Sequence, residues 1–548
     1  MSEAVTEPKA PPIAGGRPAT GRSSALIGAG IFLSRLLGLL RQSLIATYLG
    51  ANWVSDAFNG AFKITNFLQN LFGEGALSAS FIPVYANALA RHDDEEADRI
   101  AGAVASLLAM IISVIVLLGI VFAPTVVKLV VGGFTGETLD LTIRLTRILF
   151  PGAGIFVMSA WCLGILNSHR KFFLSYAAPV VWNVAMIATL VWFGRRSTLP
   201  ELAVWLAWGS VAGSALQMLV QLPVVLRVLG RLRLALRRKS PHVREIVRNF
   251  GPVFVGRGVV QISAYVDAWI ASFLVAGSVA ALTYAQNLSV LPVSLFGMSV
   301  SAAELPAMSS LRGDESAIAA AMRQRLDAGM QRIAFWIVPS AMAFLAIGDV
   351  VAGVIYQNGR FNREVAVWVW GILAGSAVGL LATTLGRLYA SSLYALRDTK
   401  TPFRFALVRV TLTIVLGYLF ALPLRAALGL PATWGAAGLT ISAGMAGWVE
   451  FALLRRAVNQ RIGKTGIPAR RLATLWGAAA LAAAVAFGIH TLAPRSRPLV
   501  AGALVIAAYG VTYFASTWIA GVEDAVDNAA RIARRLGLQR HDRGTGPR

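Results

Sequence analysis

Apolar residues dominate this chain in long runs, and each run is long enough to cross a lipid bilayer as a helix. A helix rises about 1.5 Å per residue, so about 20 apolar residues span the hydrocarbon core. The pattern therefore predicts an all-α, polytopic membrane protein. We expect about fourteen transmembrane helices, at 24–48, 54–88, 100–131, 138–166, 172–194, 200–226, 249–276, 279–309, 328–356, 364–394, 403–425, 433–454, 472–491 and 498–520.

The second predicted helix carries its polar residues on one face. At about 100° per residue, six polar side chains fall within about 80° of one another. They are Asp56, Asn59, Lys63, Asn66, Asn70 and Glu74. An ionisable side chain in a spanning helix is costly unless it faces a partner or water. The stripe, about 27 Å long, therefore predicts the wall of a water-filled cavity that receives a polar, anionic substrate.

Two arginines in the first predicted helix are a second case of charge within an apolar run. Arg35 and Arg41 lie in SRLLGLLRQ at 34–42, about 120° apart around the helix. A simpler interpretation is that Asp56 and Lys63 only neutralise each other between packed helices. That interpretation explains one pair, but neither the whole stripe nor the two arginines.

Composition agrees with a membrane protein. The chain is 56% hydrophobic and only 14% charged, whereas a soluble chain carries about a quarter charged residues. The net charge of +24 would suit nucleic acid, but multi-pass proteins gather Lys and Arg in cytoplasmic loops. Placing both termini in the cytoplasm puts most basic loops inside, so no nucleic-acid partner is expected. The single cysteine, Cys162, allows no disulfide within the chain, and the five histidines show no metal-ligand spacing.

The chain divides into two halves at a basic loop, 227–248. ILNSHRKFFLSYAAP at 165–179 and YALRDTKTPFRFALV at 394–408 belong to a weak internal repeat of about 225 residues. Six helices separate the repeats, so they run parallel, and such transporters bind substrate between the halves. We predict a disordered cytoplasmic tail at 1–22, an N-lobe at 23–226, a basic cytoplasmic linker at 227–248, a C-lobe at 249–460, a pair of extra helices at 461–520, and a basic cytoplasmic tail at 521–548. The linker either lies on anionic lipid headgroups or only enforces the topology.

In several of these segments the chain resembles the MurJ (MviN) family, the lipid II flippases of the MOP exporter superfamily. The resemblance covers roughly 24–520 and rests on SRLLGLLRQ at 34–42, SDAFNGAFKITNFLQNLFGEGALSASFIPV at 55–84, FPG with GILNSHRKF at 150–172, YAAPVVWNV at 176–184 and YALRDTKTP at 394–402. It implies two six-helix lobes around a cationic cavity for the pyrophosphate and sugars of lipid II, with the polyprenyl tail in a groove of the last two helices. It also implies alternating access across the bacterial inner (cytoplasmic) membrane, for peptidoglycan synthesis.

The resemblance assigns site residues by motif. The matching positions are Arg35, Arg41, Asp56, Lys63, Asn66 and Glu74. Arginine suits a pyrophosphate because its planar fork stays charged and donates two hydrogen bonds at once. Gln69 and Asn287, however, stand where the family usually has arginines. Arg257 in the seventh predicted helix either restores one positive charge from another wall or lies near the cytoplasmic end and snorkels.

The coupling ion is left open. Asp267 lies deep in the seventh predicted helix, where some members of the family place a sodium ligand; it could also pair with Arg409 or carry a proton. The partner segment 403–425 has no acid and no asparagine to complete a sodium site. A drive by the membrane potential needs only a net cationic cavity. We expect no bound cofactor, and a monomer that acts on lipid II or a related undecaprenyl-linked substrate.

Other functions stay in view. A flippase for another lipid-linked oligosaccharide would need a different number of arginines. The absence of arginine at Gln69 and Asn287 suggests this alternative. A cation-coupled drug exporter of the same superfamily fits the motifs and the extra helix pair less well. An enzyme such as a multi-pass glycosyltransferase would need a catalytic acid cluster on a loop or soluble domain, and the outward loops are too short. We therefore predict a transporter without catalytic residues.

Overall fold

The computed structural model describes residues 21–72, 77, 80–230, 244–248, 250, 265–492 and 498–535. Within these ranges the regular elements are helices and none is a strand, which confirms the all-α prediction. Eleven of the described helices are long and apolar enough to cross a membrane, and they coincide with eleven predicted segments. The other three, 24–48, 54–88 and 249–276, contain helix in their described parts. The total of fourteen stays a prediction.

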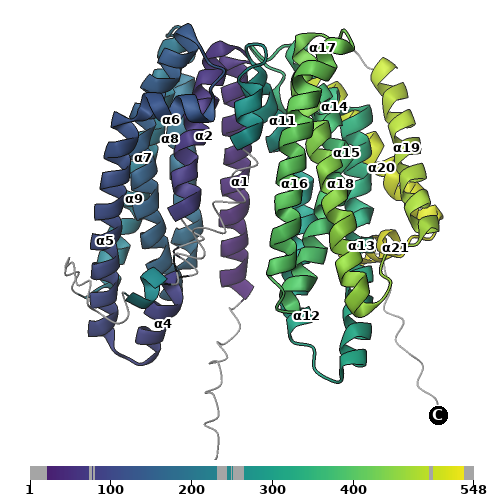
Figure 1. The fold of residues 1–548 in the computed structure, drawn as a ribbon, viewed down its shortest axis with the longest axis horizontal. Coiled ribbons are helices and arrows are strands. Elements are labelled where there is room, and N and C mark those ends of the chain that lie inside the picture. The colour runs from purple at the N-terminus through teal and green to yellow at the C-terminus, as the bar shows by residue number, and fades with distance from the viewer. Residues whose placement is uncertain are drawn as a thin grey trace, which may run out of the picture.

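The first half of the chain forms a helical bundle, the N-lobe (Figure 1). Its helices are α1 (Gly21–Leu49), α2 (Trp53–Phe72), α4 (Ile82–Ala90), α5 (Asp94–Val121), α6 (Ala123–Val130), α7 (Gly136–Ser168), α8 (Phe172–Phe193) and α9 (Leu199–Val228). α4 and α6 each begin with a proline in the first turn, where the missing N–H has no helical partner to lose. The Asp93 side chain caps α5 by accepting the Glu96 N–H at 3.0 Å.

The second half forms the C-lobe beside it. Residues 265–271 are helical, and the following helices are α11 (Ser278–Pro292), α12 (Ser299–Ser309), α13 (Glu315–Ala346), α14 (Gly348–Tyr356), α15 (Arg363–Ala395), α16 (Lys400–Leu419), α17 (Arg425–Ala427) and α18 (Gly435–Ile462). Two π-helical turns, Val293–Met298 and Phe420–Leu424, continue α11 and α16. α15 and α18 pack closely because a Cβ on Gly379 would lie only 2.2 Å from the Gly444 Cα.

The last helices pack on the outside of the C-lobe. They are α19 (Ala469–Leu492), α20 (Pro498–Ile519) and α21 (Glu523–Arg535). Two hydroxyls of α20 donate to α13 carbonyls, Tyr509 to Pro339 at 2.6 Å and Tyr513 to Phe335 at 2.7 Å. α21 lies at the same end of the molecule as the start of α1 (Figure 1). This agrees with termini on one side of the membrane, while the side itself stays a prediction.

The internal repeat has a structural counterpart in the two helix–turn–helix segments. Arg170 joins α7 to α8 with φ of 57°, and Arg397 joins α15 to α16 with φ of 60°. A positive φ is uncommon outside glycine, so its occurrence at these two positions indicates the same local turn in both halves. The division at the linker stays a prediction, because most of 227–248 lies outside the described residues.

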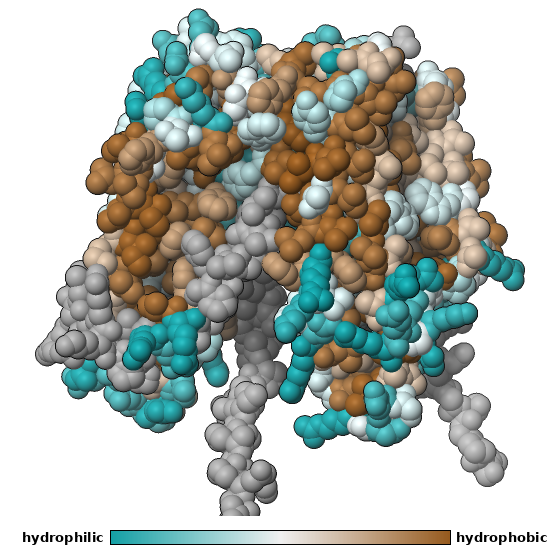
Figure 2. All heavy atoms as spheres, in the orientation of Figure 1, coloured by the Kyte–Doolittle hydropathy of each residue, from teal (hydrophilic) through white to brown (hydrophobic). Residues whose placement is uncertain are grey.

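The surface has the polarity of a membrane protein. Figure 2 shows hydrophobic side chains over the middle of both lobes and hydrophilic side chains gathered toward the two ends. Exposed apolar side chains of the described helices include Leu117, Val191 and Phe487. Because lipid chains solvate such a band, the fold is that of a multi-pass membrane protein.

Candidate functional site

The polar stripe of α2 divides into two parts with different surroundings. Asp56 and Asn59 are buried, whereas Lys63 and Asn66 are partly exposed and Asn70 is exposed. The buried part therefore lies at the end of the bundle that carries the α1–α2 turn. We call this the outer end, after its predicted orientation. Glu74, predicted to belong to the stripe, lies outside the described residues.

Asp56 joins the two lobes. Its carboxylate accepts the backbone N–H of Gly277 at 2.6 Å and that of Ala280 at 2.8 Å, so it caps the first turn of α11 from the opposite lobe. The free N–H groups and the dipole of a helix favour a negative charge there. Gly277 has φ of 95°, and a Cβ on it would lie 2.7 Å from the Ala51 oxygen. The tight approach of the lobes therefore depends on glycine at this position.

Further hydrogen bonds hold the α1–α2 turn at the same end. The Tyr284 hydroxyl donates to the Gly50 oxygen at 2.9 Å, and the Arg360 N–H donates to the Thr47 oxygen at 2.8 Å. The Ser43 hydroxyl donates to the Ile355 oxygen at 2.6 Å. The C-lobe thus contacts the turn from α11 on one side and from the α14–α15 segment on the other.

These contacts define the conformation. Among the described residues, the hydrogen bonds that join the lobes lie at the outer end, apart from one between Tyr265 and Lys63 near the middle of α2. Toward the opposite end, the described residues include a ring contact between Phe72 of α2 and Phe250, with centroids 5.7 Å apart. The outer end, where these hydrogen bonds lie, is therefore closed in this conformation.

A charge cluster lies midway between the ends. Tyr265 donates its hydroxyl hydrogen to the Lys63 oxygen at 2.9 Å, which places the 265–271 helix beside α2. Lys63 and Arg409 both act on the Asp267 carboxylate through charge–charge interactions. None of the ion pairs among the described residues includes Asp267, and its Oδ1 is buried without a hydrogen-bond partner.

Arg409 pairs with a residue that the sequence reasoning missed. Its Nη1 lies 3.1 Å from Glu450 Oε2 of α18, so the ion pair considered for Asp267 and Arg409 forms with Glu450 instead. Arg387 of α15 is exposed and interacts electrostatically with both members of this pair. This part of the C-lobe therefore holds two arginines and one carboxylate, of which Arg409 and Glu450 form the ion pair. The available signal was an isolated charge within each of three apolar runs, the same criterion that identified the α2 stripe.

The two arginines of α1 have different environments. Arg41 is buried, with Cζ 4.2 Å from the centre of the Trp182 ring and Nη1 3.9 Å from the Met186 sulfur. It therefore packs against α8 inside the N-lobe, and its Nε has no partner. Arg35 is exposed. The structure thus separates the two arginines that the sequence places in one motif.

The positions that depart from the family pattern can be located in part. Gln69 and Asn287 are partly exposed, and the Asn287 Nδ2 is buried without a hydrogen-bond partner. Arg257, the predicted replacement charge, lies outside the described residues. Arg387 and Arg409 are described cations of the C-lobe that lie near Glu450.

An apolar cavity of about 860 Å³ opens beside this cluster. Phe67, Leu71 and Leu118 line it from the N-lobe, and Trp269 and Ile414 line it from the C-lobe. The cavity therefore lies between the lobes, away from the helix pair α19–α20 to which the polyprenyl tail is assigned by resemblance. No group of three or more His, Cys, Asp or Glu side chains in the described ranges could hold a metal ion.

Comparison with known proteins identifies the family. A family model described as "Lipid II flippase MurJ" matches residues 45–532. "Lipid II flippase MurJ" of Burkholderia cenocepacia is 31% identical over 511 residues, which cover 90% of this chain and 96% of the relative. "Probable lipid II flippase MurJ" of Vibrio cholerae is 30% identical over 473 residues, 84% of this chain and 86% of the relative.

Solved structures share the fold. One described as "Lipid II flippase MurJ, inward closed conformation" has a TM-score of 0.74 at 24% identity and covers 90% of this chain and 99% of its own. An inward-facing multidrug resistance MATE family transporter of the MOP superfamily has a TM-score of 0.62 at 18% identity, over 80% of this chain and 98% of its own. On the extent of the family match, this chain belongs to the MurJ lipid II flippase family.

Proposed function

We propose that this protein moves lipid II from the inner to the outer leaflet of the bacterial cytoplasmic membrane by alternating access, for peptidoglycan synthesis. The family and the names of its curated relatives support the substrate. The observation that carries the mechanism is the asymmetry of the hydrogen bonds between the lobes, which lie at the outer end and near the middle of α2. A transporter closed on one side can load substrate from the other.

Charges from both lobes suit the headgroup. Arg35 and Lys63 belong to the N-lobe, and Arg387 with Arg409 belongs to the C-lobe, so a pyrophosphate between the lobes could contact both. Arginine and lysine donate strong charge-assisted hydrogen bonds to phosphate oxygens. A bound dianion would also weaken the attraction between Lys63 and Asp267, because it offers Lys63 another negative partner.

The coupling energy can come from the membrane potential. One elementary charge that crosses 100 mV contributes about 2.3 kcal/mol, so an excess of cations in the moving cavity suffices without a bound ion. Asp267 is the candidate for a sodium or proton site, because its Oδ1 is buried without a hydrogen-bond partner and it belongs to no ion pair among the described residues. We place the termini and the basic linker on the cytoplasmic side, where anionic lipid headgroups would attract the linker, and we expect a monomer.

Complementation tests the substrate. Bacteria depleted of their own lipid II flippase would receive wild type, Arg35→Ala, or Arg144→Ala, a matched control that removes an exposed α7 arginine. We expect growth with wild type and Arg144→Ala, and lysis with Arg35→Ala at equal membrane levels. Growth with Arg35→Ala would remove Arg35 from the site while keeping the function.

A flippase for another lipid-linked oligosaccharide is the second candidate. It is favoured by Gln69 and Asn287 at positions where the family usually has arginine, since a headgroup of different charge needs a different set of cations. Lysis with a correctly inserted wild-type protein would favour this candidate. Binding of purified protein to lipid II and to an undecaprenyl-pyrophosphate-linked neutral sugar would then separate the two substrates.

A further inference from the structure

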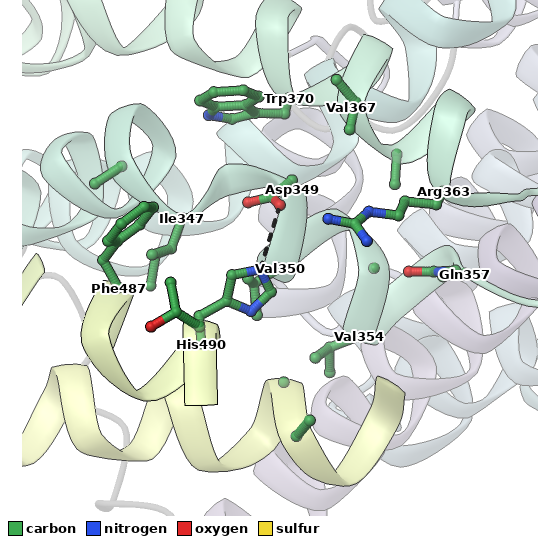
Figure 3. A pocket seen from close by; sticks show the side chains of 16 residues that line it. Ile347, Asp349, Val350, Val354, Gln357, Arg363, Val367, Trp370, Phe487 and His490 are labelled. Atoms are coloured by element: carbon green, nitrogen blue, oxygen red, sulfur yellow. Dashed lines mark ion pairs between the residues drawn. The ribbon is translucent and has the colours of Figure 1, made fainter. Parts of the chain in front are cut away.

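A second cavity lies far from the charge cluster, between the C-lobe and the last two spanning helices. Its volume is about 530 Å³, within the range of small-molecule sites. α14 and α15 line one side, and α19 and α20 line the other (Figure 3). Because α15 begins and α19 ends here, the cavity lies at the outer end of the bundle.

Three ionisable side chains face this cavity, and one of them, Arg363, belongs to no ion pair among the described residues. Figure 3 shows the Asp349 carboxylate, the Arg363 guanidinium and the His490 imidazole directed into one space from three helices. Asp349 Oδ2 lies 3.9 Å from His490 Nε2, but no ion pair among the described residues joins Arg363 to Asp349. A carboxylate and a guanidinium that share a cavity without touching leave room for a ligand that pairs with each.

The remaining wall is apolar and open to lipid. Val354 and Phe487 line the cavity, and the Phe487 side chain is 58% exposed. Leu499 and Val500, at the start of α20, are 60% and 55% exposed. A ligand here therefore meets charged groups at one end and acyl-chain surroundings at the other, which is the environment of a phospholipid at the membrane interface.

We propose that this cavity binds a zwitterionic phospholipid, with the phosphate on Arg363 and the headgroup ammonium on Asp349. Arginine recognises phosphate through paired N–H donors, and the ammonium requires an acceptor that Asp349 supplies. The Trp370 ring borders the same space (Figure 3) and offers a face to a cation. A purely anionic headgroup fits less well, because Asp349 repels it.

The site also connects to the closed outer end. Gln357 and Arg363 line the cavity, and between them lies the turn whose Arg360 N–H donates to the Thr47 oxygen of α1. A lipid that fixes both ends of this turn stabilises the contact with α1 and therefore the closed outer end. By linkage, opening that end lowers the affinity of the cavity for the lipid by the same factor.

Native mass spectrometry of the purified full-length protein tests the site. Phosphatidylethanolamine, phosphatidylglycerol and undecaprenyl phosphate would be titrated at matched concentrations. We expect preferential retention of phosphatidylethanolamine, and a loss of about tenfold in its affinity in Asp349→Asn, the scale of one charge-assisted hydrogen bond. Asp349→Asn should not weaken phosphatidylglycerol binding, whereas Arg363→Gln should weaken the binding of both phospholipids.

Two further variants complete the design. Val367→Trp fills the cavity without removing a charge and should also abolish the preference, which guards against misfolding of a charge variant. Arg325→Gln removes an exposed arginine, paired with Glu304, outside the cavity and should change nothing. Equal retention of the two phospholipids, or a preference that survives Asp349→Asn and Val367→Trp, would overturn the proposal. Preferred binding of undecaprenyl phosphate would overturn it in favour of an anionic isoprenoid.

Discussion

The contact between Asp56 and α11 should control the opening of the outer end. Asp56→Asn keeps one acceptor oxygen but turns an NH2 group toward a backbone N–H that now has no acceptor. The two bonds at 2.6 and 2.8 Å are of the charge-assisted kind, each contributing about 1.5–3 kcal/mol, and an unsatisfied buried donor costs a similar amount. A net shift of about 2–4 kcal/mol would raise the ratio of outer-open to outer-closed protein roughly 30- to 1000-fold.

Distance measurements between spin labels can detect this shift. Cys162 is buried, so Cys162→Ser provides a background for labels at Arg195→Cys in the N-lobe and Leu428→Cys in the C-lobe, both exposed at the outer end. The wild type should give one short distance, and Asp56→Asn should add a longer one. Asp140→Asn, the same change at an exposed position, is the control. An unchanged distribution in Asp56→Asn would refute the role assigned to this contact.

Three further outcomes follow from the same structure. Arg41→Ala should lower the thermal unfolding midpoint, because a buried cation on an aromatic ring contributes up to about 2 kcal/mol; an unchanged midpoint would contradict this packing role. Lys63→Met and Asp267→Asn should each destabilise the protein, because each leaves the other charge without its partner. In a double-mutant cycle, the double variant should lose less unfolding free energy than the sum of the two single losses. Additive losses would show that the two charges do not interact. Hydrogen bonds from Thr401, and after them the ion pair with Arg461, hold the pKa of Asp398 well below its usual range. The stabilisation that the Asp398 carboxylate contributes is therefore complete above the unfolded-state pKa of about 3.9, and it declines as pH falls through the lower folded value. The difference in unfolding midpoint between wild type and Asp398→Asn should therefore be equal at pH 7 and pH 5 and narrow below about pH 4; a difference that is constant down to the lowest pH would count against it.

The helices were predictable because the bilayer imposes their length and composition. The described helices from α5 to α20 match predicted segments in position, since a spanning segment must satisfy its backbone internally and present apolar side chains to lipid. Ends were less predictable: α13 begins at Glu315, within a polar stretch that hydropathy assigns to a loop. A helix continues past the apolar boundary wherever its polar residues can face water.

Side-chain partners were not predictable in the same way. The helical periodicity placed Asp56 and Lys63 on one face of α2. The structure shows that Asp56 accepts hydrogen bonds from residues 221 and 224 positions away in sequence. Arg41 shares a motif with Arg35, yet its guanidinium packs on Trp182 of another helix. Both outcomes depend on which helix lies opposite, and a single sequence contains no record of that pairing.

The division of the α2 stripe has a mechanical consequence. Asp56 and Lys63 are seven residues apart on one helix, about 10 Å along its axis, and each faces a different part of the C-lobe: Asp56 the start of α11, and Lys63 the 265–271 helix. An anionic headgroup bound as proposed would compete for Lys63 but could not replace the backbone donors that bind Asp56. If lipid II binds at Lys63 as proposed, it should weaken the attraction near the middle of α2 first, while the contact at the outer end still holds. Because α2 is a continuous helix from Trp53 to Phe72, we expect a tilt that begins at Lys63 to be transmitted to Asp56, so that the outer end opens only after the headgroup lies between the lobes.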